Sequence, residues 1–233
     1  MGRHPVVPAR LLSSLVDFIY PPVCLICYNP LSPDQQFVCT TCRQSIHRVT
    51  SPVVSAHRLG LLDNHPIFFK QSIACFEFDG TMQKLIHEMK YRGMSKLGFI
   101  LGQELGRCML NSGVVDCFDV LVPVPLHPLR KRERGYNQAL ILANGIGSVV
   151  DKAVVAKVLY RKRYTRQQAK FDKQERIENV RDAFKIVNPK WIGKKRVALV
   201  DDVLTTGSTM NECARVIRQK TDANITAVTL VRI

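Results

Sequence analysis

Apolar runs and helical stripes alternate along the chain from residue 73 onward. Runs typical of strands occupy residues 73–78, 119–125, 154–159, 197–200 and 225–231. Between them, apolar residues recur at helical spacing, as in Met82, Leu85, Ile86 and Met89, in Leu97, Leu101 and Leu105, and around Leu142 and Ile146. Strands that alternate with helices predict an α/β fold with a mostly parallel, doubly wound sheet.

The chain before residue 73 has a different character. Residues 10–20 predict a short amphipathic helix that ends at two consecutive prolines. Residues 51–72 are irregular and contain Pro52, Gly60 and Pro66. We therefore expect a helix plus a cysteine-containing element over residues 1–50, a linker or loop over 51–72, and the α/β domain over 73–233. We expect no transmembrane segment, because no apolar run is long enough to cross a membrane.

Four of the eight cysteines form two close pairs, Cys24 with Cys27 and Cys39 with Cys42. Two C-x-x-C pairs separated by eleven residues can place four thiolates around one ion, the pattern of a structural zinc site. Two disulfides, a redox C-x-x-C pair or an iron–sulfur cluster are the alternatives. The remaining cysteines are scattered singly, at positions 75, 108, 117 and 213. A reducing compartment with one zinc site is the simplest interpretation.

The chain is strongly basic, with 34 Lys and Arg residues against 19 Asp and Glu, a net charge of +15. Such an excess favours polyanionic partners: nucleic acid, phosphorylated metabolites or an anionic membrane. One basic cluster, Arg130, Lys131, Arg132 and Arg134, follows the strand at 119–125 and suits a diphosphate or nucleic acid. Residues 157–176 hold eight basic and two acidic residues. A mobile loop near an active site and a nucleic-acid arm both fit that segment.

The most informative stretch comes after the apolar strand at 197–200. Two carboxylates follow it, and then a loop of hydroxyl residues with one glycine leads into a helix. Backbone N–H groups and hydroxyls at a helix N-terminus bind phosphate, while carboxylates accept hydrogen bonds from sugar hydroxyls or bind a metal. Together they predict a clamp for a ribose 5-phosphate. An ordinary strand–loop–helix connection with Ser208 as N-cap is the alternative.

This stretch resembles the phosphoribosyl pyrophosphate (PRPP) signature of type I phosphoribosyltransferases. Further motifs in the same order resemble the ComF/GntX family: the four-cysteine element and the segments 90–93, 123–126, 134–138, 163–168 and 201–209. The resemblance implies a type I phosphoribosyltransferase fold with a small N-terminal zinc-binding element. Tyr136 stands where many relatives have phenylalanine, a departure that keeps the aromatic ring.

The resemblance also implies roles for individual residues. Asp201 and Asp202 would accept the ribose hydroxyls, with Mg²⁺ nearby. The phosphoribosyl group would be held further by Thr205, Thr206, Gly207, Ser208 and Thr209, and the pyrophosphate would meet Arg130, Lys131 and Arg134. Segment 163–168 would correspond to a loop that closes over PRPP. The candidate nucleic-acid contacts are Arg161, Lys162, Arg163, Arg166 and Lys170.

Two functions follow from this resemblance. The first is a cytoplasmic DNA-uptake protein, serving natural transformation or the use of external DNA, that binds single-stranded DNA and a phosphoribosyl ligand such as PRPP. Its expected partners are DNA-import or recombination proteins, and an import complex would bring it to the inner membrane surface. The alternative is an active phosphoribosyltransferase of nucleotide metabolism. The sequence names neither catalytic residues nor an acceptor, and the dispersed aromatic residues predict mainly electrostatic, salt-sensitive DNA binding.

Overall fold

The structure is a computed structural model that describes residues 22–59, 65–164 and 172–233. The chain divides into two units, Met1–Ile46 and His47–Ile233. The amphipathic helix predicted over residues 10–20 lies outside the described residues. No helix in the described ranges is long and apolar enough to span a membrane.

The described part of the first unit consists of tight turns and one short helix, α2 (Thr40–Gln44). Tyr28 and Phe37 both take the left-handed backbone conformation, with φ of 63° at each residue. The Cys39 side chain accepts a hydrogen bond from the backbone N–H of Cys42, which caps the start of α2. Cysteine side chains therefore organise this unit.

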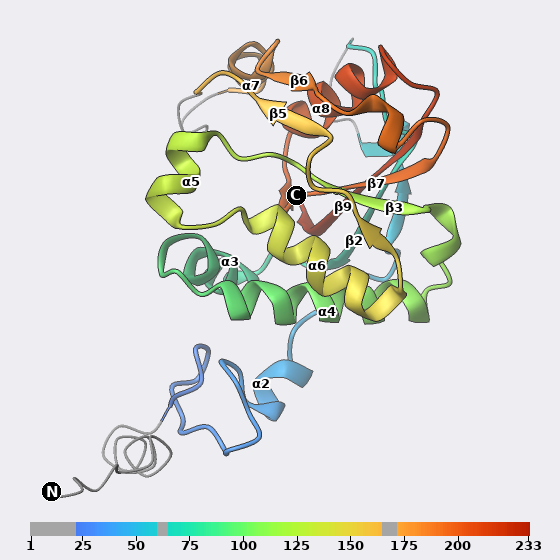
Figure 1. Cartoon of the computed structure of the whole chain (residues 1–233). Coiled ribbons are helices and arrows are strands. Elements are labelled where there is room, and N and C mark those ends of the chain that lie inside the picture. The colour runs from blue at the N-terminus through green and yellow to red at the C-terminus, as the bar shows by residue number, and fades with distance from the viewer. Residues whose placement is uncertain (1–21, 60–64, 165–171) are drawn as a thin grey trace, which may run out of the picture. The chain divides into compact units, whose positions relative to one another are not determined.

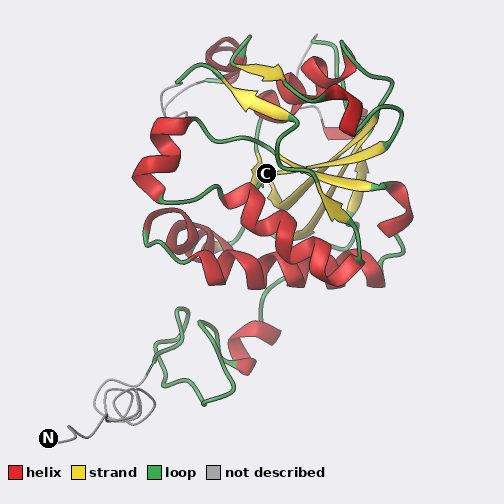
Figure 2. Ribbon diagram, viewed as in Figure 1, coloured by secondary structure: helices red, strands yellow, loops and turns green. Residues whose placement is uncertain are grey.

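The second unit is an α/β fold built around a seven-stranded sheet (Figures 1 and 2). Its strands are β1 (Val53–Ser55), β2 (Gln71–Phe76), β3 (Val120–Pro123), β4 (Ala153–Val154), β7 (Arg196–Val200), β8 (Val203–Leu204) and β9 (Asn224–Arg232). Its helices are α3 (Gly80–Tyr91), α4 (Ser95–Asn111), α5 (Pro128–Arg134), α6 (Gln138–Val150), α7 (Lys173–Val180) and α8 (Ser208–Arg218). Short 3₁₀ helices cover Ala56–Leu59, Val115–Cys117 and Pro189–Trp191.

The strand order is β1-β2-β9-β7-β3-β4, and β8 pairs with the end of β9. All pairs are parallel except β1 with β2. In the centre of the sheet, β7 lies between β3 and β9, with Val197 opposite both Val120 and Ile225. The interior residues of β7 are completely buried, as expected for a central strand covered on both faces. The predicted fold class is confirmed.

Helices cover both faces of the sheet. Figure 1 shows α3, α4 and α6 together on one side, and α8 on the other. Val197 and Leu199 of β7 belong to a core cluster with Met210 and Ile217 of α8. Because side chains alternate along a strand, Ala198 faces the opposite layer. Open α/β sheets of this kind bind ligands at the carboxyl ends of their strands, here the ends of β3 and β7.

The apolar run at 154–159, predicted as one strand, is instead split between two sheets. Its start belongs to β4, which pairs with β3, and Val155 continues that pairing by donating its N–H to the Leu121 carbonyl at 2.8 Å. Its end opens β5 (Leu159–Arg161), which pairs antiparallel with β6 (Phe184–Ile186) in a separate two-stranded sheet. The turn between them contains no glycine or proline, so the sequence lacked a breaker signal there.

Two other segments also differ from the prediction. The segment 51–72, expected to be a linker or loop, contributes β1, the start of β2 and the buried Phe69. Cys75 of β2 and Cys108 of α4, expected to remain single, form a disulfide with their Cα atoms 6.3 Å apart. The two cysteines are 33 positions apart, and it is the packing of α4 that brings them together, so their spacing carried no signal.

Candidate functional site

A pocket of about 290 Å³ opens where β7 ends. The acidic pair follows the strand directly, β8 continues beside β9, and the loop 205–207 leads into α8. Gly207 takes the left-handed conformation, with φ of 71°, and is itself the N-cap of α8; a residue without a Cβ adopts that geometry at no steric cost. The alternative interpretation, an ordinary connection with Ser208 as N-cap, differs from the structure because the N-cap is Gly207.

Six of the seven predicted phosphoribosyl-binding residues line this pocket. The lining residues are Lys90, Arg176, Asp201, Asp202, Val203, Leu204, Thr205, Gly207, Ser208, Thr209 and Met210. Thr206, the seventh, lies beside it, with its hydroxyl 3.1 Å from that of Ser208. The pocket thus combines carboxylates, hydroxyls and the N-terminus of an eleven-residue helix, a set of groups suited to a phosphorylated sugar.

Lys90 and Arg176 are pocket residues that the sequence-based assignment missed. Lys90 lies in the last turn of α3, and its Nζ atom lies 2.9 Å from Asp202 Oδ1. Burial alone would lower the pKa of Lys90, but the charges of Asp202 and Asp201 raise it overall. Lys90 belongs to segment 90–93, one of the motifs of the family resemblance, and that motif could have indicated its role. Arg176 comes from α7, in a segment that we had considered only as a mobile loop or nucleic-acid arm.

The acidic pair has distinct environments. Burial, followed by the charge of Asp202, raises the pKa of Asp201 from its ordinary 3.8 to about 7. Asp201 Oδ1 also accepts the backbone N–H of Asp202 at 2.9 Å. Asp202 is 8% exposed and ion-paired with Lys90. One carboxylate is thus neutralised by a lysine, whereas the other titrates near neutral pH.

Segment 134–138 connects three elements near this pocket by hydrogen bonds: the end of α3, the end of β3 and the start of α6. Gly135 ends α5 with φ of 82°. The Tyr136 hydroxyl donates a hydrogen bond to the Met89 carbonyl, directly before Lys90. Asn137 donates from Nδ2 to the Val124 carbonyl at 3.0 Å and caps α6 through Oδ1. The tyrosine hydroxyl, absent from a phenylalanine, therefore ties α3 to the turn between α5 and α6.

The basic residues predicted to meet pyrophosphate lie on α5. Arg130, Lys131 and Arg134 are not among the residues that line the pocket in the described part of the chain. Arg134 is nonetheless close enough to Lys90 for its charge to oppose protonation of that lysine. The structure therefore places α5 at the border of the pocket.

The predicted nucleic-acid contacts separate into four groups, of which Arg163 is described last. Arg161 points inward: it stacks over Phe184 at 5.1 Å, burial lowers its pKa, and Cys213 and Asp201 lie close enough to raise that pKa in turn. Lys162 is exposed at the surface. Arg166 and Lys170 lie outside the described residues.

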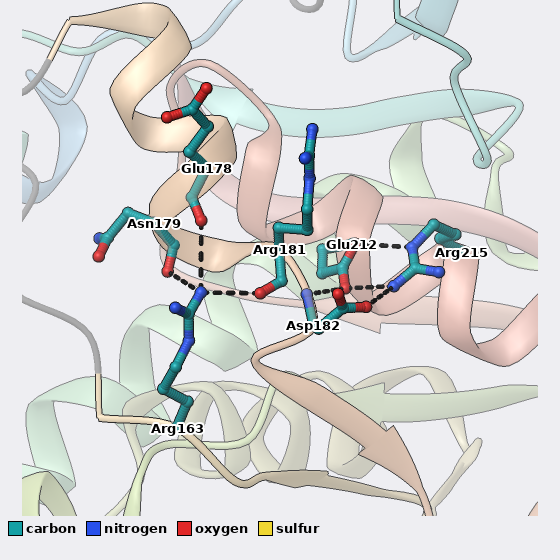
Figure 3. A network of polar contacts seen from close by, with 7 residues as sticks. All are labelled: Arg163, Glu178, Asn179, Arg181, Asp182, Glu212 and Arg215. Atoms are coloured by element: carbon teal, nitrogen blue, oxygen red, sulfur yellow. Dashed lines mark hydrogen bonds and ion pairs between the residues drawn. The ribbon is translucent and has the colours of Figure 1, made fainter.

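Arg163 closes the C-terminus of α7 (Figure 3). Its Nη2 atom donates to the carbonyls of Glu178 at 3.3 Å, Asn179 at 3.1 Å and Arg181 at 2.7 Å. A cation is favourable at that end of a helix, where carbonyls lack partners. The structure thus gives Arg163 a helix-capping role.

The loop after α7 is in turn fastened to α8. The N–H of Asp182 donates to Glu212 Oε1 at 2.8 Å, and Arg215 Nη2 lies 2.8 Å from Asp182 Oδ1 (Figure 3). Because α8 begins at the pocket, this network joins the helix that carries Arg176 to the helix that follows the loop 205–207.

The four predicted zinc ligands converge in the first unit. The Sγ atoms of Cys24, Cys27, Cys39 and Cys42 all lie within 4.8 Å of one another. Burial raises the pKa of Cys24, but N–H groups of Cys27, Cys39 and Ile26 lower it more, to about 6. Four converging sulfur ligands with N–H groups directed at them fit a structural zinc ion.

The second unit has an α/β fold with a mostly parallel sheet, and the first unit holds a four-cysteine cluster that fits structural zinc. A family model described as a double zinc ribbon domain matches residues 15–55, which contain the four cysteines of one such site.

Similar proteins carry names connected with competence or DNA utilization. Competence protein F of Haemophilus influenzae is 36% identical over 102 residues, covering 43% of this chain and 44% of that protein. DNA utilization protein YhgH of Salmonella typhi is 24% identical over 91% of this chain and 97% of its own length. Competence protein ComFC of Bacillus subtilis is 26% identical over 90% and 84%. These similarities support the resemblance to the ComF family that the sequence motifs indicate.

Among solved structures, the chain is similar to the glutamine PRPP amidotransferase of B. subtilis complexed with ADP and GMP. The TM-score is 0.40 at 18% identity, covering 60% of this chain and 30% of that one. The chain thus spans less than a third of that enzyme, and less than half of the H. influenzae relative.

Proposed function

We propose that this chain is a DNA-uptake protein that binds single-stranded DNA and a phosphoribosyl ligand such as PRPP together with Mg²⁺. The observation that carries the proposal is the pocket at the end of β7, where Asp201 and Asp202 lie beside the N-terminus of α8. The names of the relatives support the DNA-uptake role, and the net charge of +15 supports a polyanionic partner.

Each part of the pocket has a task in this proposal. The N–H groups and hydroxyls of the loop at 205–209 would hold the 5-phosphate. Asp201 and Asp202 would accept the ribose hydroxyls, and Mg²⁺, when bound to PRPP, would neutralise the pyrophosphate beside the carboxylates. Lys90 and Arg176 supply positive charge to the lining of the pocket. Zinc would hold the first unit together.

Calorimetry with PRPP and Mg²⁺ tests the pocket. The double variant Asp201→Ala with Asp202→Ala should abolish binding. Asp222→Ala is the matched control, because this exposed carboxylate precedes β9, at the opposite edge of the sheet. Equal binding by the double variant and the control would refute the clamp.

Fluorescence anisotropy with a labelled oligonucleotide tests the DNA partner. Binding should be strong at low salt and fall steeply as salt rises, because phosphate neutralisation releases counterions. A protein that does not bind at about 50 mM salt lacks the proposed partner.

Active phosphoribosyl transfer is the second candidate, favoured by the two pocket cations, which could stabilise a departing pyrophosphate. Pyrophosphate release from PRPP, measured with and without DNA and with a panel of bases, separates the two functions. Base-dependent release would establish a transferase, whereas binding without turnover would establish a binding protein.

A further inference from the structure

Two tyrosine rings lie exposed on either side of α5. Tyr91, the last residue of α3, is 54% exposed, and Tyr164, three residues beyond β5, is 43% exposed. Figure 1 shows α5 at the margin of the second unit, between β5 and α3. Large exposed aromatic side chains that gather at one place mark a binding surface.

Each ring is held by an arginine of α5. The guanidinium carbon of Arg130 lies 5.2 Å from the centre of the Tyr164 ring, and that of Arg134 lies 5.2 Å from the centre of the Tyr91 ring. Residues four apart share one face of a helix, with about 6 Å between them along the axis. The side chains therefore form one row, Tyr164–Arg130–Arg134–Tyr91, which we name the α5 strip.

A histidine supports each ring from another side. The His127 ring lies edge-on to Tyr164 at 5.2 Å, and the His87 ring lies 4.9 Å from Tyr91. With two neighbours each, the rings are oriented before any ligand arrives, which reduces the entropy cost of binding.

The surroundings of the strip are basic and open. The seven residues of α5 include four cations and only one carboxylate, and Lys131 and Arg132 are exposed. Beyond Tyr164, an open groove of about 640 Å³ is lined by three cations and two carboxylates: Lys162, Arg163, Arg181, Glu178 and Asp182. At the other end, Arg134 is close to Lys90 of the phosphoribosyl pocket.

We propose that the α5 strip is the surface on which single-stranded DNA lies, with bases stacked on Tyr91 and Tyr164 and phosphates paired with Arg130 and Arg134. The inference rests on the proposed function and gives its DNA partner a location. Exposed rings that flank a pair of cations fit a single strand, because a duplex keeps its base faces stacked inside. A small phosphorylated ligand could bind the two arginines but would offer no base to stack on the two tyrosine rings.

The test uses the full chain and two labelled oligonucleotides of equal length, one normal and one abasic. Tyr91→Leu and Tyr164→Leu should each weaken binding of the normal strand about tenfold, the loss of one stacked base. The phenylalanine variants should bind as the wild type does. Both leucine variants should bind the abasic strand as weakly as the wild type binds it, because only phosphate contacts remain.

Trp191→Leu is the matched control. Trp191 is 48% exposed but precedes β7, at the edge of the sheet opposite the strip, so its removal should leave DNA binding unchanged. Arg130→Gln and Arg134→Gln should each reduce the slope of log K against log salt by about one, whereas the tyrosine variants should keep the slope.

The outcomes separate this inference from the function on which it rests. If the wild type binds the normal strand and the tyrosine variants bind it equally well, the strip is refuted and DNA binding stands. If the tyrosine variants lose affinity for the abasic strand in the same proportion, stacking is refuted. If the wild type binds neither strand at about 50 mM salt, the DNA partner itself is refuted.

Discussion

Lys90 and Asp202 form an ion pair between the end of α3 and the end of β7, with Nζ and Oδ1 2.9 Å apart. Both side chains are largely buried, at 23% and 11% exposed. The two residues are far apart in the sequence and come from elements on different sides of the pocket. The pair therefore fixes α3 against the ligand edge of the sheet and neutralises one of two adjacent carboxylates.

Lys90→Met is expected to lower the free energy of unfolding by about 1–3 kcal/mol, because it leaves Asp202 buried without its partner. Lys96→Met, at an exposed position near the start of α4, should change stability little. Adding Asp202→Asn to Lys90→Met should recover part of the loss, since no charge then lacks a counter-ion. Urea unfolding of these three variants and the wild type measures these effects, and equal stabilities for Lys90→Met and Lys96→Met would contradict the pairing.

Asp201→Asn is expected to stabilise the protein in a pH-dependent way. The pKa of Asp201 is raised from 3.8 to about 7 in the folded chain. Between these values the folded state binds more protons than the unfolded state, so the free energy of unfolding falls as pH rises. Asparagine lacks this penalty and should exceed the wild type by at least about 1 kcal/mol at pH 8, with little difference near pH 4.

Unfolding titrations at several pH values check this result, with Asp222→Asn as the exposed control. A difference between Asp201→Asn and wild type that stays constant with pH would show that Asp201 does not titrate near neutrality. Asp201→Asn should also bind PRPP more weakly. The Asp201 carboxylate would then increase the affinity for PRPP while it lowers the stability of the fold.

The part of the site predicted well from sequence is the part that is continuous in sequence. The stretch from Val197 to Thr209 forms a strand, a loop and a helix start, and local rules of periodicity and turn chemistry suffice to interpret it. The cysteine pairs are likewise interpretable because C-x-x-C spacing reflects the geometry of one metal site.

Long-range relationships were beyond reach of such rules. Lys90 lies in the pocket because it pairs with Asp202, which is 112 positions away, and Arg163 caps a helix that begins ten positions later. The disulfide between β2 and α4 arises in the same way. One local signal was available and overlooked: Asp172 and Glu175 form a capping box that starts α7 within the basic segment.

Removal of zinc is expected to unfold the first unit and leave the second intact. Metal analysis should find about one zinc per chain, and Cys24→Ser should abolish it. Structural zinc contributes on the order of 10 kcal/mol to elements of this size, so limited proteolysis should then cut within residues 22–46 while the α/β unit persists. Cys117→Ser, at an exposed free cysteine, should retain the metal. Retention of zinc by the Cys24 variant would exclude the four-cysteine site.

Gly145→Ala is expected to destabilise the second unit because α4 and α6 cross with their backbones in contact. A Cβ atom on Gly145 would overlap the Phe99 carbonyl oxygen and would lie 2.9 Å from the Gly102 Cα atom. Alanine stabilises a helix by about 1 kcal/mol relative to glycine. Forcing an extra methyl group into a tightly packed contact typically costs about 1–3 kcal/mol or more. Because the second effect is larger, we expect a net decrease in the free energy of unfolding.

Gly80→Ala provides the matched comparison for that crossing. Gly80 is the first residue of α3, and a Cβ atom there would meet nothing within 4 Å. Its substitution should be neutral or stabilising by up to about 1 kcal/mol. In thermal unfolding, the melting temperature should therefore fall for Gly145→Ala and stay the same or rise for Gly80→Ala, although the chemical change is the same. A Gly145→Ala protein that melts at or above the wild-type temperature would mean that α4 and α6 do not approach closely in solution.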